Sequence, residues 1–316
     1  MLPLRTTALG CQRVPRSVSR SLSTLSHQKL ATWQESLKKK AINETDEITS
    51  GHSHLVALTL DPSTPRDPFA TFPAGHPLPS GYHFALFPPR IPESDLAPDG
   101  YDTEFSPPEP YIQRMWAGGS FEFVPDNPLR VGQTVKQTTR LDDVQIKQGP
   151  RGEAVLVWLE KVVENEHGRS LRERRCLAYM GKERNPTVGG RVVPIKTVAE
   201  FARTITPTIV TLFRYSAVTF NSHRIHYDNH YAKDQEGYPD CLTHGPLTAT
   251  LLLDLLERHL ANSGAKIKSF SYRTLSPLIV NDPVTFCGKK TAANQFELWA
   301  KNKQGGIAVK GSAEVS

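Results

Sequence analysis

Long apolar segments are absent from this sequence, and their absence argues against a membrane-spanning protein. No stretch of about eighteen uncharged apolar residues occurs, which is the length that a membrane helix needs. Hydrophobic residues make up 38% of the chain and charged residues 22%, the balance of an ordinary globular protein. A chain of 316 residues is long enough for two domains, each with a core of its own.

Cysteine is scarce, and its spacing excludes two kinds of site. The four cysteines, Cys11, Cys176, Cys241 and Cys287, lie far apart and form no C-x-x-C pair. Neither a disulfide framework nor a cysteine-rich zinc site is expected, and a reducing interior or the mitochondrial matrix fits this pattern. The histidines and acids of residues 223–236 match no standard zinc spacing, so we expect no metal and no cofactor.

Acidic residues are missing from the first 34 positions. The basic residues of this segment are Arg5, Arg13, Arg16, Arg20 and Lys29. An acid-free segment rich in Arg, Ser and Leu is typical of a mitochondrial transit peptide, which we place at residues 1–28 with cleavage near 22–24. A disordered basic tail is the alternative. The segment carries most of the net charge of +6, so the remainder offers no electrostatic surface for nucleic acid.

The next part of the chain changes from helix to coil to strands. Apolar residues recur at three-to-four spacing in residues 30–42, which predicts a short amphipathic helix. Residues 61–110 hold a large share of the 25 prolines and are expected to be extended coil. Alternating patterns then predict three strands, of which the last two form a hairpin, at 133–148, 152–165 and 169–180.

A turn-rich segment at 182–200 marks the boundary between two predicted domains, 29–190 and 191–316. The second domain is expected to open near Pro207 with Thr206 as a possible cap. Residues 244–261 predict a helix that is apolar around most of its circumference, so a sheet must wrap it. Predicted strands follow at 265–280, 282–290, 295–302 and 306–315. One buried helix followed by antiparallel strands describes an α+β fold.

Polar side chains are concentrated in "TFNSHRIHYD" at 219–228, and "THGPL" at 243–247 follows at the start of the predicted helix. Together these segments resemble the signature of the MaoC-like hotdog-fold thioester hydratases and dehydratases, Gly-Asp-x-Asn-Pro-(Ile/Leu)-His followed by His-Gly. Laid on this chain, the resemblance places His226 at the histidine of the signature. Asn221 stands where the signature has aspartate.

Two further segments, "RMWAGGSFEF" at 114–123 and "GYPDCLTHGPL" at 237–247, are similar to a two-hotdog branch of that family. The branch includes the hydroxyacyl-thioester dehydratases type 2 and the mesaconyl-CoA hydratases, and the likeness covers about residues 100–316. It implies a double hotdog, in which antiparallel sheets each wrap a central helix. The first half lacks the polar motif and is expected to be a degenerate hotdog that shapes the substrate cavity. Trp116 and its neighbouring glycines either line that cavity or pack against the second half.

The chemistry of dehydration assigns roles to three residues. Removing water from a 3-hydroxyacyl thioester takes a proton from the α carbon and hydroxide from the β carbon, while charge develops on the thioester oxygen. We expect His226, titrating near neutrality, to act as the acid and base, with a structural histidine as the alternative. Gly245 offers a backbone N–H at a helix start to the thioester oxygen. Asn221 cannot exchange a proton and would orient the water or hydroxyl.

The neighbouring polar residues leave several interpretations open. Asp228 or Glu236 could supply the missing carboxylate, or Asp228 could fix the tautomer of the catalytic histidine. Arg224 could bind a phosphate of the thioester carrier or only pair with Asp228. His244 is expected to support the helix cap. The predicted substrate-binding residues are Arg224, His223, His244 and Asp228.

These observations predict a hydro-lyase that converts (3R)-hydroxyacyl thioesters to trans-2-enoyl thioesters in mitochondrial fatty acid synthesis. Hydration of a short dicarboxylic thioester such as mesaconyl-CoA is the alternative reaction, which an extra cation in the acyl pocket would favour. A non-catalytic acyl-thioester binding protein is an alternative of a different class. The expected partner is a thioester of acyl carrier protein or coenzyme A, no nucleic-acid or membrane partner is expected, and a homodimer is left open.

Overall fold

The computed structural model describes residues 16–149, 152–181, 194 and 197–316, with backbone only for 16–24. The boundary predicted at residue 190 lies outside these residues. The strands are β1 (Ala41–Glu47), β2 (Tyr111–Phe123), β3 (Thr134–Gly149), β4 (Gly152–Asn165), β5 (Gly168–Gly181), β6 (Phe201–Ile205), β7 (Ile267–Thr274), β8 (Val284–Ala292), β9 (Gln295–Lys301) and β10 (Ile307–Val315). The α-helices are α1 (Arg16–Leu37), α2 (Ser50–Leu60), α3 (Pro68–Thr71), α4 (Ile209–Val218) and α5 (Gly245–Leu260). The short helical turns are η1 (Tyr82–Ala85), η2 (Glu93–Asp95), η3 (Arg224–His226) and η4 (Tyr231–Gln235).

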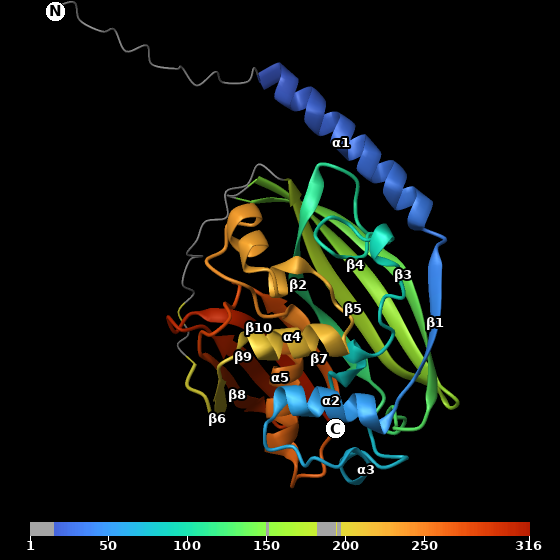
Figure 1. Ribbon diagram of the computed structural model, residues 1–316, viewed down its shortest axis with the longest axis vertical. Helices are drawn as coiled ribbons and strands as arrows, with labels where there is room; N and C mark the ends of the chain where they lie inside the picture. Colours follow the sequence, from blue (N-terminus) through green and yellow to red (C-terminus); the bar gives the residue numbers. More distant parts are fainter. Residues whose placement is uncertain (1–15, 150–151, 182–193, 195–196) are drawn as a thin grey trace, which may run out of the picture.

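One continuous sheet of ten strands runs through both halves of the chain (Figure 1). Its order is β1-β3-β4-β5-β2 in the first half and, read from the opposite edge, β6-β8-β9-β10-β7 in the second. The two halves therefore repeat one topology, and all neighbouring strands are antiparallel. They meet where β2 pairs with β7, with Gly118–Glu122 opposite Arg273–Ser269.

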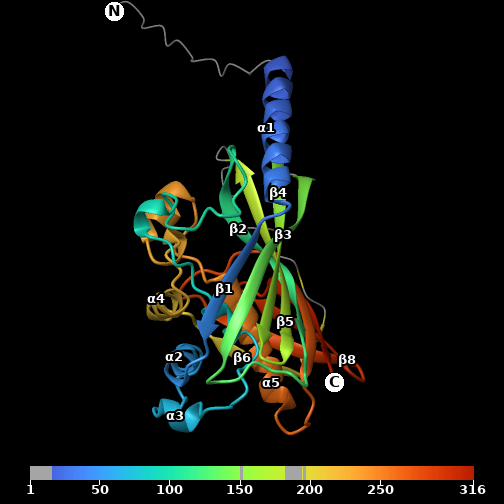
Figure 2. The same ribbon diagram turned by 90° about the vertical axis from the view of Figure 1, so that its right-hand side faces the viewer.

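Helix α5 fills the inside of the second half. Ten of its residues are buried, and it contacts strands β6 to β9 as well as β2. Its apolar circumference therefore has the environment that the sequence predicted, and the α+β assignment is confirmed. In the first half, α2 is 11 residues long against 16 for α5. Figure 2 shows α2, α3 and α4 on one side of the sheet.

Several predicted boundaries were wrong for local reasons. The helix expected at 30–42 is α1, which ends at Leu37, and the chain continues into β1. Thr208, not Thr206, caps α4, since its hydroxyl accepts a hydrogen bond from the N–H of Thr211 at 3.2 Å. Strand β7 stops at Thr274, and Pro277 three residues later has no N–H to continue the ladder.

Helix α1 overlaps the predicted transit peptide. The cleavage predicted near 22–24 falls within the helix, and residues 1–15 lie outside the described part of the chain. Past that point, His27 bonds to Glu153 at 2.9 Å, and Leu30 and Leu37 are buried against β4 and β5. The transit peptide stays a prediction. Between residues 16 and 316, no described helix is long and apolar enough to cross a membrane.

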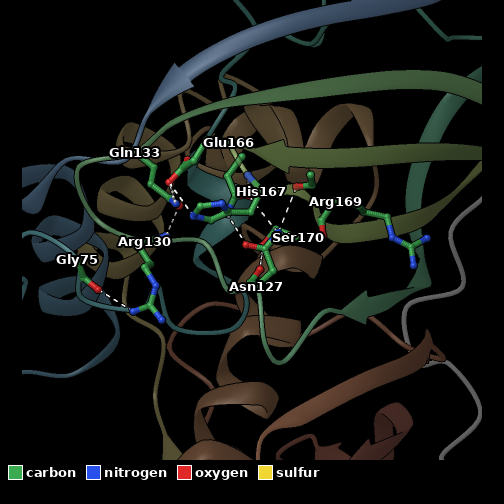
Figure 3. Close-up of polar contacts among 10 residues, drawn as sticks. Gly75, Asn127, Arg130, Gln133, Glu166, His167, Arg169 and Ser170 are labelled. Atoms are coloured by element: carbon green, nitrogen blue, oxygen red, sulfur yellow. Dashed lines mark hydrogen bonds and ion pairs between the residues drawn. The ribbon is translucent and has the colours of Figure 1, made fainter.

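The tight turn between β4 and β5 is held from outside the hairpin (Figure 3). The side chain of Asn127 donates to the carbonyls of Gly168 and Arg169 at 3.3 and 3.2 Å and exchanges hydrogen bonds with the side chain of Asn165. The hydroxyl of Ser170 donates to the Asn127 carbonyl at 2.6 Å. These bonds fix the register of β5, whose side chains reach the cavity described below.

Glycine at position 118 is required by the junction of the halves. Its φ is +135°, and a Cβ there would lie 2.3 Å from the carbonyl oxygen of Tyr272 on β7. We expect Gly118→Ala to lower the free energy of unfolding by more than about 3 kcal/mol, because strain and the clash add. Gly168→Ala is the control, since φ is +98° but nothing lies within 4 Å; it should cost about 1 kcal/mol. If urea unfolding showed the same decrease in the free energy of unfolding for Gly118→Ala and Gly168→Ala, this account would be contradicted.

Candidate active site

The start of α5 lies at the meeting point of the two halves. His244 is the N-cap residue, and Gly245 is the first residue of the helix, whose early N–H groups have no partner inside the helix. A Cβ on Gly245 would lie 2.4 Å from Cγ of Trp116, so the indole of β2 packs directly on the glycine. The N–H of that indole donates to the hydroxyl of Tyr272 at 2.9 Å.

The ring of His226 is held in one orientation beside this helix start. Its Nδ1 lies 2.8 Å from the carbonyl oxygen of Leu242, and its ring stacks on that of His244 with centroids 3.7 Å apart. A carbonyl oxygen can only accept, so Nδ1 carries the proton and Nε2 carries the lone pair. The side chain keeps some accessible surface because it lines a cavity. His226 therefore brings an unprotonated ring nitrogen to a residue position that lines the cavity.

Burial keeps this imidazole neutral. Loss of water lowers the pKa of His226 to about 4; the Leu242 bond opposes the shift and the charge of Arg114 adds to it. The expectation that His226 titrates near neutrality was therefore wrong. Burial also lowers the pKa of His223 and of His244 well below the usual histidine value. All three rings are neutral at physiological pH.

Asn221 lines the same cavity and is fixed by backbone contacts. Its N–H donates to the carbonyl of Ser216 at 2.8 Å, and its side-chain oxygen accepts from the N–H of His223 at 3.0 Å. Phe220 just before it has φ of +50°. With its oxygen engaged, the amide of Asn221 has N–H donors left for a ligand.

Of the two histidines predicted to bind substrate, His223 lines the cavity and His244 does not. The ring of His244 bonds to the hydroxyl of Ser216 at 2.9 Å and makes no side-chain cap, so the expected support of the cap comes only from its backbone position. A ring nitrogen of His223 lies 3.4 Å from a carboxylate oxygen of Asp99. The His223 and His226 rings are arranged edge to face, with centroids 5.5 Å apart.

Three nearby charged side chains have partners other than His226; they are those of Arg224, Asp228 and Glu236. Arg224 pairs with Asp228 at 2.8 Å, and the arginine side chain is 42% exposed. Asp228 therefore does not fix the tautomer of His226, because the Leu242 carbonyl does. Glu236 accepts hydrogen bonds from Tyr231 at 2.9 Å and Gln113 at 2.6 Å. Neither carboxylate contacts His226 within the described chain.

The first half contributes a loop that sequence reasoning missed. The backbone N–H of Arg224 donates to the Asp99 carbonyl at 2.8 Å, and a Cβ on Gly100 would lie 2.2 Å from the carbonyl oxygen of Ser222. Arg114 on β2 pairs with Asp99 at 3.4 Å and covers the ring of Tyr101 at 3.4 Å. The only signal was "PDGYD" at 98–102, polar residues within the proline-rich segment.

A single cavity of about 1000 Å³ joins these residues to the first half. Its volume is at the upper end of small-molecule sites. It is lined by His226, Asn221 and Gly245 at the second half, by Trp116 at the junction, and by Arg175 and Lys161 in the first half. No group of three or more His, Cys, Asp or Glu in the described ranges is arranged to hold a metal ion.

Comparison with known proteins identifies the family. The model of the family described as hydroxyacyl-thioester dehydratase type 2 matches residues 81–280. The chain belongs to this family. Its hotdog architecture agrees with the MaoC-like dehydratase structure from Phytophthora capsici, which has a TM-score of 0.64 and 15% identity over 92% of this chain and 97% of that one. The double-hotdog prediction is thereby confirmed.

Two curated relatives extend over most of the chain. The mesaconyl-C(4)-CoA hydratase of Chloroflexus aurantiacus is 33% identical over 85% of this chain and 93% of its own length. The mitochondrial hydroxyacyl-thioester dehydratase type 2 of Schizosaccharomyces pombe is 27% identical over 81% and 88%. Membership of this dehydratase type 2 family makes the chain a hydro-lyase of acyl thioesters.

The buried histidines predict a dependence of stability on pH. A histidine with a lowered pKa binds its proton more readily in the unfolded chain, so stability falls as pH drops below about 6.5 toward the folded pKa. We expect the unfolding temperature to fall between pH 7 and pH 5. His244→Gln should flatten the slope, and His230→Gln, at a side chain 94% exposed, should leave it unchanged. A slope that is identical in all three proteins would contradict the assignment.

Proposed function

We propose that the chain catalyses reversible removal of water from 3-hydroxyacyl thioesters, with His226 as the group that carries the proton. One observation supports this most strongly. The Nδ1–H of His226 is bound to a backbone carbonyl, which leaves the basic Nε2 for a ligand in a cavity that also contains the start of α5. Catalysis, not a structural role, is the function that this arrangement favours.

The reaction can be written with this one histidine. In dehydration, Nε2 of His226 removes the proton from the α carbon, and that electron pair forms the double bond to the β carbon. Hydroxide leaves the β carbon and takes the proton from the imidazolium, which gives water and restores the neutral ring. Hydration runs through the same steps in reverse. The neutral imidazole is the starting form in both directions, in agreement with its lowered pKa.

Two other groups act on the charges that form. The N–H of Gly245 and the positive end of α5 stabilise the negative charge on the thioester oxygen. The amide of Asn221 donates to the β hydroxyl, so it orients the leaving group without exchanging a proton. Arg224, on the exposed side of the motif, remains a candidate for a phosphate of the carrier, because its pair with Asp228 is solvent-exposed and weak.

The substrate class is the finer part of the proposal. Dehydration of (3R)-hydroxyacyl chains in mitochondrial fatty acid synthesis is supported by the two yeast relatives, both named as mitochondrial, and by the acid-free N-terminal segment. Hydration of a dicarboxylic thioester is the second candidate. It is supported by the relative named mesaconyl-C(4)-CoA hydratase and by the cations Lys161 and Arg175 in the cavity.

Substitution at His226 tests the proposal. We expect His226→Ala to lower kcat/KM for crotonyl-CoA hydration by about a thousandfold, because the base is lost, and Asn221→Ala by about tenfold, because one hydrogen bond is lost. His230→Ala is the control, since that side chain is 94% exposed. A His226→Ala protein with full activity would exclude the mechanism. A folded wild type that binds thioesters but turns none over, at any chain length, would favour a binding protein instead.

A further inference from the structure

The proposed reaction leaves unused a set of charged residues on the inner face of the first half. Lys161 on β4 lies directly opposite Glu173 on β5 and Thr139 on β3. Arg175 follows two residues after Glu173 and so faces the same side of the sheet. Lys161 and Arg175 both line the cavity that contains His226. Two cations therefore lie on the wall of the space where an acyl group must fit.

Arg175 is already paired. Its guanidinium makes two hydrogen bonds to the carboxylate of Glu173, at 2.7 and 3.1 Å, and lies over the rings of Trp116 and Phe84 at 4.8 and 5.6 Å. His83 lies on the other side of Glu173, at 3.7 Å. The carboxylate of Glu173 is thus committed to these neighbours.

Lys161 has much weaker compensation. Its ammonium donates to the hydroxyl of Thr139 at 3.2 Å, and within the described residues no carboxylate forms an ion pair with it. The nearby acids are engaged elsewhere. Glu44 accepts from Gln137 at 2.9 Å, and Asp102, which also lines the cavity, accepts from the backbone N–H of Glu104 at 2.7 Å.

The Lys161 side chain is only partly exposed, and an ammonium that loses part of its hydration and gains one neutral acceptor is destabilised. Burial and the charge of Arg175 lower the pKa of Lys161 to about 8, although the charges of Glu173, Glu44 and Asp102 oppose this shift. Burial also raises the pKa of Asp102. A neutral hydrocarbon chain in the cavity would leave this cost in place. An anion beside Lys161 would remove it.

The contacts along the cavity show where such an anion would be carried. Gly245, the proposed site of the thioester oxygen, touches Trp116, and the Trp116 ring touches Arg175. Arg175 is hydrogen-bonded to Glu173, and Glu173 lies opposite Lys161 on the neighbouring strand. An acyl group that starts at Gly245 and runs past Trp116 therefore directs its far end toward the cations.

We propose that Lys161 is the centre of a carboxylate-binding subsite, and that the substrate is a dicarboxylic thioester whose free carboxylate binds there. Thr139 positions the ammonium, and Arg175, neutralised by Glu173, adds N–H groups and a rigid wall. This proposal rests on the proposed function for the reaction at the thioester end. Of the two candidate acyl classes given above, it selects the dicarboxylic one.

Binding of saturated thioesters tests the subsite without turnover. Succinyl-, glutaryl- and adipoyl-CoA are compared by calorimetry with butyryl-, valeryl- and hexanoyl-CoA, each pair having the same chain length. In the wild type, the Kd of the dicarboxylic member should be lower by at least about tenfold at one length or more, as expected for a buried charge-assisted hydrogen bond.

Three variants assign that preference to one side chain. Lys161→Met keeps most of the stem and removes the charge, so it should bring each pair to within about twofold. Lys161→Arg keeps a cation and should retain part of the preference. Lys136→Met is the matched control, on the neighbouring strand but exposed. Lys161→Met should unfold at the same or a higher temperature, because a partly buried charge without an ion pair is lost.

The outcomes separate the two proposals. Equal Kd values within every pair in the wild type, or an unchanged preference in Lys161→Met, would overturn the subsite; crotonyl-CoA hydration by the wild type would still support the hydro-lyase. A carboxylate preference that depends on Lys161 in a protein that hydrates no thioester would support the subsite and reject the reaction.

Discussion

The hydrogen bond between His226 and the carbonyl of Leu242 is the contact on which the candidate site depends. It fixes which nitrogen carries the proton, and the stacked ring of His244 fixes the plane of the imidazole. Since burial disfavours the charged form, the ring stays neutral and the lone pair of its second nitrogen stays free to accept a proton. A single histidine can then take and return one proton, which makes the replacement of aspartate by Asn221 compatible with catalysis.

The halves of the chain repeat one topology but supply different parts of the site. The second half brings the histidine motif and the start of α5, while the first brings Trp116, the loop at Asp99 and the charged wall of β4 and β5. In the proposed function, the first half, which lacks the histidine motif, lines the space for the acyl group.

Sequence patterns predicted the parts of the site that are local. The motif at 219–228 and the His-Gly at the helix start gave His226, Asn221 and Gly245, because their spacing is fixed within one connected segment. Asp99 and Arg114 could not be found in this way, since they reach the site from distant segments. Lys161 lies in an alternating strand, and alternation does not tell which face encloses a cavity.

Burial also reversed an expectation about charge. From the sequence alone, a histidine is assigned its ordinary pKa. The structure shows that His226 is packed against His223 and His244 and lies near the charge of Arg114, and burial makes its pKa far lower. The pH dependence of kcat/KM for crotonyl-CoA hydration tests this most directly, because the free-enzyme base sets the acid limb. The account predicts no inflection above pH 5 in enzyme that remains folded. A fall in rate centred near pH 6.5 and absent from His226→Ala would contradict it.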